Sequence, residues 1–316
     1  MLQSINGVFI LLVFLVHIKW FMLLPLGFPF TSNVDRMYSV FFECLGQLIV
    51  VPFLFYSGYG ISERIKEDPK YLSNFVVHRI LPLYLNFLVA LMFYICIWAV
   101  FDGTITPYVL LKGFCLQYSF GNPTWFLFCT FYCYISTLFI FLSCNRRMYR
   151  AIFLMLSCGV YVCCMKHRPS FWYNTIFSYA FGAFVSLYKE EICVMVKAIN
   201  KHCIWRIVNF TLFLLLLIAL KAFPYEMLGI RENLSGLAFI SVLVFVTCKF
   251  EIGNKVVSWL GRHVFPIYMY HLLFFFLAKN LLPKPISCLK AHLAVIVCFG
   301  MTCMTAYLSN FGTYAL

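Results

Sequence analysis

The sequence predicts an all-α, polytopic integral membrane protein. Of its 316 residues, 63% are hydrophobic, 20% are aromatic and only 11% are charged. The hydrophobic residues occur in runs of about 20, the length that an α-helix needs to cross ~30 Å of hydrocarbon. No charged segment between these runs is long enough to fold as a soluble domain, so we expect a single membrane domain over residues 1–316.

Ten apolar runs, separated by polar breaks, are expected to be membrane-spanning helices. They cover residues 5–24, 38–62, 78–101, 124–143, 150–166, 171–188, 204–222, 234–249, 263–282 and 289–309. The first run has neither a basic segment before it nor a small-residue cleavage site after it, so we expect it to be retained. Connections on the N-terminal side carry fourteen Lys and Arg residues and the opposite connections carry ten. This excess predicts that both termini are cytoplasmic.

The net charge of +13 does not indicate a nucleic acid partner. The basic residues lie in short connections between apolar runs, where anionic lipid headgroups and membrane orientation account for them. Most of the 15 Cys residues lie inside the runs, where Cys behaves as a small apolar residue. Neither Cys129 with Cys133 nor Cys163 with Cys164 has the spacing and His partners of a zinc site. We therefore expect no metal and no disulfide framework.

The first run carries two polar residues, Asn6 and His17. They are eleven residues apart, close to three turns of a helix, so both project from one face about 16 Å apart along the axis. An imidazole at lipid depth is costly unless it faces a bundle interior or a wet cavity, which makes His17 a functional candidate. The alternative is a neutral His that only hydrogen-bonds a neighbouring helix.

The second run carries Glu43 and Gln47 on one helix face, and Ser57 returns close to that face. A carboxylate at Glu43 is suited to orient an imidazole across the bundle, whereas a place near the outer headgroups is the alternative. Gly58 and Gly60 at the end of the run allow another helix or a ligand to approach the backbone closely. A helix-packing seam is the simpler explanation of the two glycines.

Further polar candidates lie at the ends of other runs. Arg79 stands at the mouth of the third run, and its guanidinium suits phosphate oxygens, although a membrane anchor is the alternative. Trp125 and Tyr268 are also typical of the membrane interface, and His271 is equally explained as the partner of a Tyr hydroxyl.

Five segments, in order along the chain, resemble patterns of one protein family. They are Asn6 to His17, Phe55-Tyr56-Ser57-Gly58-Tyr59, His78-Arg79-Ile80-Leu81-Pro82, Gly121-Asn122-Pro123-Thr124-Trp125-Phe126-Leu127, and Leu260 to His271. The family is acyltransferase 3, membrane-bound acyltransferases that include O-acetyltransferases of bacterial surface polysaccharides. The resemblance spans residues 6–271.

The resemblance implies transfer of an acyl group, usually acetyl from acetyl-CoA, to a hydroxyl of a lipid-linked or cell-surface glycan at the inner or plasma membrane. His17 matches the family's essential histidine and is the expected general base, and Glu43 and Ser57 are the other catalytic candidates. Arg79 matches an arginine that helps to hold the CoA phosphates. The remaining expected binding residues are Asn6, Trp125, Tyr268 and His271.

This chemistry is reasonable for these residue types. A hydroxyl attacks a thioester when a neutral imidazole removes its proton, and the developing oxyanion needs hydrogen-bond donors. Donor candidates by residue type are Asn6, Ser57, Trp125 and Tyr268. The sequence has no Gly-x-Ser-x-Gly elbow or reactive-Cys signature, which favours direct transfer over an acyl-enzyme.

Asn6 departs from the family pattern, which has a basic residue eleven positions before the histidine. Either Lys19 or Arg262 supplies the missing charge, or activity is reduced or lost. His78 likewise stands where the family has a second arginine beside Arg79. A polysaccharide or lipid-linked sugar transporter, or an inactive component of an export complex, is therefore the alternative function. The lack of an internal repeat weakens the transporter alternative.

Overall fold

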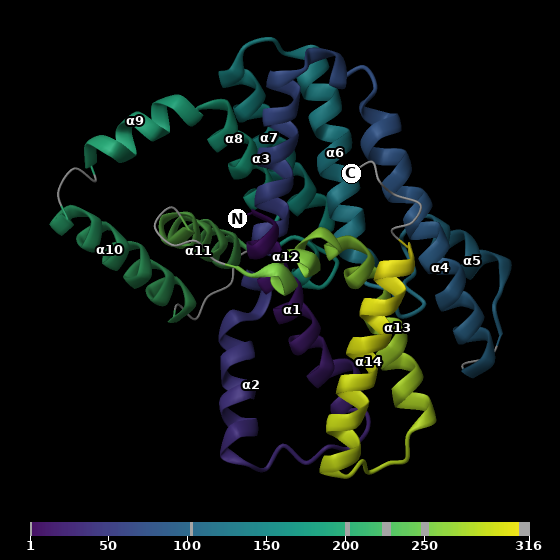
Figure 1. Cartoon of the computed structure of the whole chain (residues 1–316). Helices are drawn as coiled ribbons and strands as arrows, with labels where there is room; N and C mark the ends of the chain where they lie inside the picture. Colours follow the sequence, from purple (N-terminus) through teal and green to yellow (C-terminus); the bar gives the residue numbers. More distant parts are fainter. Residues whose placement is uncertain (1, 102–103, 200–202, 223–228, 248–252, 310–316) are drawn as a thin grey trace. The chain divides into compact units, whose positions relative to one another are not determined.

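The computed structural model describes residues 2–101, 104–199, 203–222, 229–247 and 253–309. Its helices are α1 (Leu2–Ile18), α2 (Asn33–Leu45), α3 (Val51–Glu67), α4 (Leu81–Phe101), α5 (Pro107–Phe114), α6 (Thr124–Ser143), α7 (Arg147–Met165), α8 (Phe177–Leu187), α9 (Lys189–Ile199), α10 (Cys203–Ala222), α11 (Ile230–Thr247), α12 (Lys255–Arg262), α13 (Val264–Leu281) and α14 (Cys288–Ser309) (Figure 1). Short π-helical turns at Lys19–Leu23 and Val76–Ile80 continue α1 and precede α4. The described residues contain no β-strand, which confirms the all-α prediction.

Seven helical segments in the described part of the chain are long and apolar enough to cross a membrane. They are Gln3–Leu23, Asn33–Glu67, Val76–Phe101, Thr124–Ser143, Arg147–Met165, Val264–Leu281 and Cys288–Ser309. These segments match the first five and the last two of the ten expected runs. The other three runs are also helical, at α8, α10 and α11. We still predict, without a test, that the chain has ten membrane spans and that both termini are cytoplasmic.

The run expected over residues 171–188 is shorter in the structure. A 3-10 turn at Ser170–Trp172 precedes it, and the α-helix α8 contains only 11 residues. At 1.5 Å per residue it is about 16 Å long, roughly half of the hydrocarbon thickness.

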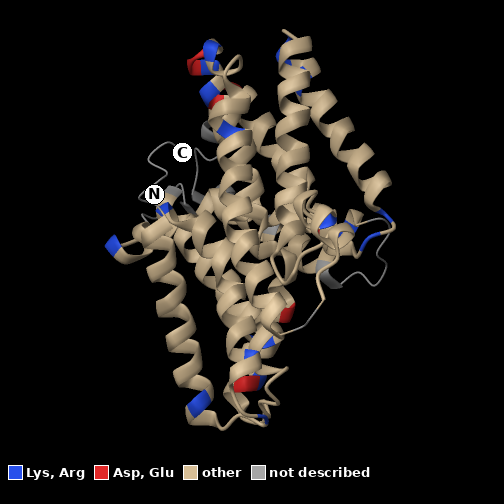
Figure 2. Cartoon of the chain, turned by 90° about the vertical axis from the view of Figure 1, so that its right-hand side faces the viewer, with Lys and Arg blue, Asp and Glu red and all other residues tan. Residues whose placement is uncertain are grey.

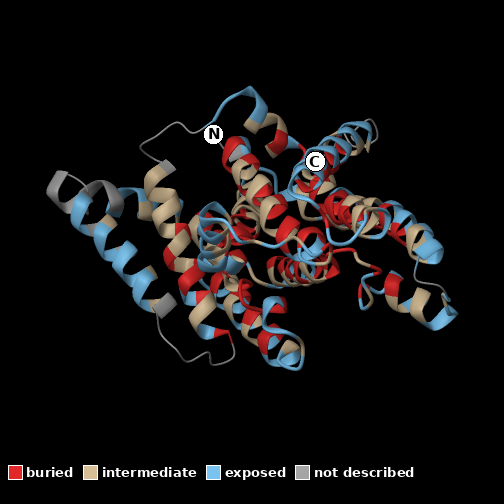
Figure 3. Ribbon diagram, turned by 90° about the horizontal axis from the view of Figure 1, so that it is seen from below, coloured by how far each residue is buried: buried red, intermediate tan, exposed pale blue. Residues whose placement is uncertain are grey.

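Side-chain distribution along the long helices agrees with a lipid environment. Lys, Arg, Asp and Glu gather near the ends of the long helices, and the middle turns lack them (Figure 2). Helices also carry exposed faces beside buried ones (Figure 3). Large apolar side chains lie on these exposed faces, for example Val100, Phe139 and Ile296. Apolar surface of this extent is stable in hydrocarbon rather than in water.

The chain divides into two compact units. The first contains Met1–Glu43, Val77–Phe128 and Ile252–Leu316, and the second contains Cys44–Val76 and Cys129–Glu251. The single domain expected over residues 1–316 remains a prediction.

In the first unit, α1 lies against the short helix α12 (Figure 1). A Cβ atom added to Gly7 would lie 1.9 Å from the carbonyl oxygen of Val257, and one added to Gly261 would lie 1.6 Å from that of Gln3. Both glycines are therefore required for this backbone contact, since larger residues would separate the helices. The side chain of Asn254 caps α12 by accepting from Val257 N at 3.0 Å.

In the second unit, α3 and α8 make the same kind of contact. A Cβ atom on Gly58 would lie 2.1 Å from the carbonyl oxygen of Tyr179, and one on Gly182 would lie 2.0 Å from that of Phe55. Gly58 thus belongs to a helix-packing seam. Gly60 differs, because a Cβ atom there meets no atom within 4 Å.

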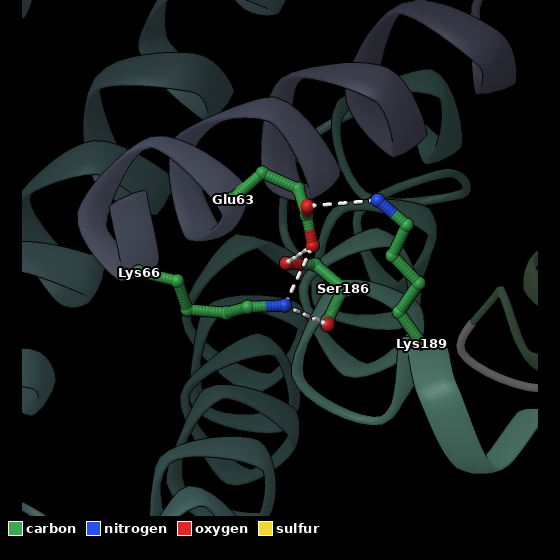
Figure 4. Close-up of polar contacts among 4 residues, drawn as sticks. All are labelled: Glu63, Lys66, Ser186 and Lys189. Atoms are coloured by element: carbon green, nitrogen blue, oxygen red, sulfur yellow. Dashed lines mark hydrogen bonds and ion pairs between the residues drawn. The ribbon is translucent and has the colours of Figure 1, made fainter. Parts of the chain in front are cut away.

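A charged cluster joins α3 to α8 and α9 at the end of this seam (Figure 4). The Glu63 carboxylate accepts hydrogen bonds from Lys66 Nζ at 2.7 Å, Ser186 Oγ at 2.9 Å and Lys189 Nζ at 3.1 Å. Lys66 also donates to the carbonyl oxygen of Ser186 at 2.7 Å. The hydrogen bond from its ammonium to Glu63 raises the pKa of Lys189. The cluster ties three helices together at one end of the unit.

The α3–α8 seam predicts opposite effects for two substitutions on one helix. Gly58→Ala should destabilise the protein by about 1–3 kcal/mol, because the new methyl group overlaps the backbone of α8. Gly60→Ala should be neutral or stabilising, because the methyl group meets open space and alanine favours a helix. Unfolding of the purified variants in detergent measures both changes. Equal stability of the two variants would contradict the seam.

Candidate active site

Two histidines from distant parts of the chain meet in the first unit. His17, in the last turn of α1, and His271, in α13, lie with Nδ1 of His17 2.6 Å from Nε2 of His271. The two ring planes are only 7° apart. His271 is completely buried, whereas His17 is half-buried. The imidazole nearer to the exposed side is therefore that of His17.

Hydrogen bonds of His271 to its own helix define where the ring protons lie. Nδ1 of His271 is 2.8 Å from the carbonyl oxygen of Tyr268 and 3.2 Å from that of Ile267. A carbonyl oxygen only accepts, so Nδ1 of a neutral His271 carries the hydrogen and its Nε2 is an acceptor. Nδ1 of His17 must then be the donor. This assignment leaves Nε2 of His17 unprotonated, with a lone pair able to accept a proton.

Aromatic rings enclose the pair of histidines. The centroid of Phe14 lies 6.3 Å from that of His271, 4.9 Å from Phe275 and 5.0 Å from Phe299. Phe21 packs edge-on against His17, with 5.3 Å between centroids. Such contacts hold ring orientations and remove competing water from around the hydrogen bond.

Lys19, two residues after His17, forms a second polar pair with Glu43. Lys19 Nζ donates to Glu43 Oε1 at 2.8 Å, and the lysine side chain is only 9% exposed whereas that of glutamate is 60% exposed. The prediction that Glu43 orients an imidazole is thus corrected: Glu43 holds Lys19, and His17 is held by His271. Lys19 begins the π-helical turn after α1, which changes the direction of its side chain relative to a regular helix.

Asn6 lies three turns before His17 on the same continuous helix. Its Oδ1 atom is buried and has no hydrogen-bond partner among the described residues. Because about 16 Å of helix separates the two residues, Asn6 cannot donate to an oxyanion that forms beside His17. Any ligand contact of Asn6 would involve a distant part of the same molecule. The proposed substitute Arg262 is exposed at the end of α12.

Tyr268 connects the histidines to the turn before α6. It is 4% exposed, its ring centroid is 5.8 Å from that of His271, and its hydroxyl donates to the carbonyl oxygen of Pro123 at 3.5 Å. The buried side chain of Tyr268 therefore faces the protein interior. Trp125 is half-buried and packs against Phe126, with 5.7 Å between ring centroids.

Asn122 is a further site candidate, and it lies in the segment Gly121 to Leu127 that resembles the family pattern. It is 2% exposed, and neither polar atom of its side chain has a hydrogen-bond partner among the described residues. Buried amides of this kind need a partner, so Asn122 is available to a bound polar group. Asn122 precedes Pro123, whose carbonyl oxygen accepts a hydrogen bond from the Tyr268 hydroxyl. The ring of Tyr268 in turn packs against His271, so Asn122 lies near the histidine pair. Its position in the Asn-Pro-Thr-Trp segment was the available sequence signal.

Two further expected residues, Arg79 and Ser57, lie in other segments of the chain. Arg79 is half-buried in the π-helical turn before α4. Ser57 belongs to the second unit, where its hydroxyl oxygen lies 2.9 Å from that of Tyr134. Among residues described by the structure, no group of three or more His, Cys, Asp or Glu is placed to hold a metal ion.

The comparison with protein families gives one match over nearly the whole chain. Residues 2–310 match a family model described as an acyltransferase domain, the Acyl_transf_3 model. No curated protein and no solved structure matches the chain. Both histidines and all other candidate residues lie inside the matched region.

Proposed function

Since the chain belongs to the acyltransferase 3 family and is a membrane acyltransferase, we propose that it transfers acetyl from acetyl-CoA to a hydroxyl of a cell-surface or lipid-linked glycan, with His17 as general base. The observation that carries the proposal is the hydrogen bond between His17 and His271, which leaves Nε2 of His17 unprotonated. The protein would act in the inner or plasma membrane.

In the proposed reaction, Nε2 of His17 removes the proton of the acceptor hydroxyl as its oxygen attacks the thioester carbonyl carbon. The resulting tetrahedral intermediate then collapses, and the carbon–sulfur bond breaks. The imidazolium returns the proton to the leaving thiolate, so that CoA leaves as the free thiol. Proton transfer through one imidazole requires no acyl-enzyme, in agreement with the absence of a nucleophile elbow in the sequence.

His271 would act as the positioning residue for His17. When His17 accepts the proton it becomes a cation whose Nδ1–H still donates to Nε2 of His271. The acceptor is itself polarised, because His271 donates from its other nitrogen to the Tyr268 carbonyl. This arrangement resembles in purpose the carboxylate that orients the histidine of a catalytic triad, with the imidazole of His271 in place of the carboxylate.

Three polar groups are suited to bind the charged and polar atoms of the acetyl-CoA donor. The ammonium of Lys19 lies two residues after His17 and is held by Glu43, so it provides buried positive charge on the same helix. Asn122 provides a buried amide that lacks a described partner. Arg79 would bind the CoA phosphates with its guanidinium.

The base assignment predicts the effect of three substitutions. His17→Ala should abolish acetyl transfer, and His271→Ala should lower kcat by up to roughly 10⁴-fold, the effect of losing the group that orients a catalytic histidine. His292→Ala is the control, because this exposed histidine on α14 hydrogen-bonds to Cys288 of its own helix. Transfer of radiolabelled acetyl groups to cellular glycans measures all three. Full activity of His17→Ala, at normal protein levels, would remove the base assignment.

Asn6 favours a second function, an inactive relative that serves transport or export. Asparagine offers no charge where the family has a basic residue, and here its Oδ1 is buried without a described partner. A protein of this kind would neither bind nor hydrolyse acetyl-CoA.

Asn6→Arg tests between the two functions. Suppose that the chain is an acetyltransferase and that residue 6 contacts acetyl-CoA away from its thioester. The positive charge of Asn6→Arg should then lower the KM for acetyl-CoA about tenfold and leave kcat nearly unchanged. Steady-state kinetics with purified protein in detergent separates these parameters. Acetyl-CoA turnover that is absent in both the wild type and Asn6→Arg would support the inactive relative.

A further inference from the structure

An open groove runs between α7 and α8 in the second unit. Its volume is about 890 Å³, and every residue that lines it is uncharged. One wall comes from α7, with Met148 and Leu156 among its residues, and the other comes from α8, with Phe177 and Phe184. The size lies within the range of roughly 300–1,000 Å³ that is typical of ligand sites.

The α7 wall is a regular stripe. Met148, Ile152, Leu156 and Val160 recur at every fourth residue, and all four are large apolar side chains exposed on the helix. The stripe is about 18 Å long at 1.5 Å per residue, which is close to the ~15 Å hydrocarbon depth of one leaflet. Gly159 deepens the groove beside the stripe, because a Cβ atom there meets no atom within 4 Å.

One end of the groove is basic. Arg147 begins α7 immediately before Met148, and its guanidinium lies 4.8 Å from the ring centroid of Tyr188, which also lines the groove. Arg147 pairs with Glu191. Arg146 is exposed and has no carboxylate partner among the described residues. Its side chain does not cap α7, so the positive N-terminal end of that helix adds to the charge.

We propose that this groove binds an acyl chain of an anionic phospholipid, whose phosphate lies against Arg146 and the N-terminus of α7. The occupant follows from charge complementarity: the apolar groove begins at Met148, two residues after Arg146, an exposed arginine without a described acidic partner. Positively charged residues at a membrane surface attract anionic headgroups. A zwitterionic lipid would gain the apolar contact but little from the arginine. The proposal is independent of the acyltransferase reaction.

Native mass spectrometry of the purified full-length chain tests this proposal. The protein is incubated with equal amounts of phosphatidylglycerol and phosphatidylcholine that carry the same acyl chains. The wild type should retain at least fivefold more phosphatidylglycerol. Equal retention of the two lipids would overturn the headgroup assignment, and a lipid-free dimer of the chain would overturn the lipid as occupant.

Matched variants place the lipid in the groove. Gly159→Leu should reduce bound phosphatidylglycerol at least fivefold by filling the groove, whereas Gly300→Leu on α14, where an added Cβ atom also meets open space, should leave it unchanged. Arg146→Gln should remove the preference for phosphatidylglycerol, and the exposed Lys290→Gln should not. Unchanged lipid retention in Gly159→Leu, or an unchanged preference in Arg146→Gln, would contradict the proposal.

Discussion

The hydrogen bond between His17 and His271 is the interaction on which the candidate site depends. The backbone carbonyl of Tyr268 occupies one nitrogen of His271, and the other nitrogen accepts from His17. Helix α13 thereby determines that Nε2 is the unprotonated nitrogen of His17 on α1. An isolated neutral imidazole would exchange between its two tautomers, so His17 alone would have no fixed unprotonated nitrogen.

Glycine contacts bring the elements of this site together. Gly7 and Gly261 allow α1 to lie against the backbone of α12, and α13 begins only three residues after Gly261. Gly58 and Gly182 join α3 to α8 in the second unit by the same means. Helices in lipid gain little from burying apolar surface, so close backbone packing of this kind is a main source of their association.

The features that the sequence predicts correctly are those with a local physical signal. Apolar runs of sufficient length predicted the seven long helices, and the polar residues inside them identified His17 and His271 as candidates. The pairing of the two residues joins positions 254 apart and leaves no local pattern. The π-helical turn at Lys19 and the burial of Asn122 are likewise tertiary features. The contact of Glu43 with Lys19 also joins separate segments, so the sequence leaves open whether Glu43 orients an imidazole or lies near the outer headgroups.

Nitrogen NMR of histidine-labelled protein in lipid tests the central claim most directly. For His17, the account predicts a protonated Nδ1 and an unprotonated Nε2 at neutral pH, with a coupling or correlation that joins Nδ1 to Nε2 of His271. A His17 ring protonated at Nε2, or one without any correlation to His271, would contradict it.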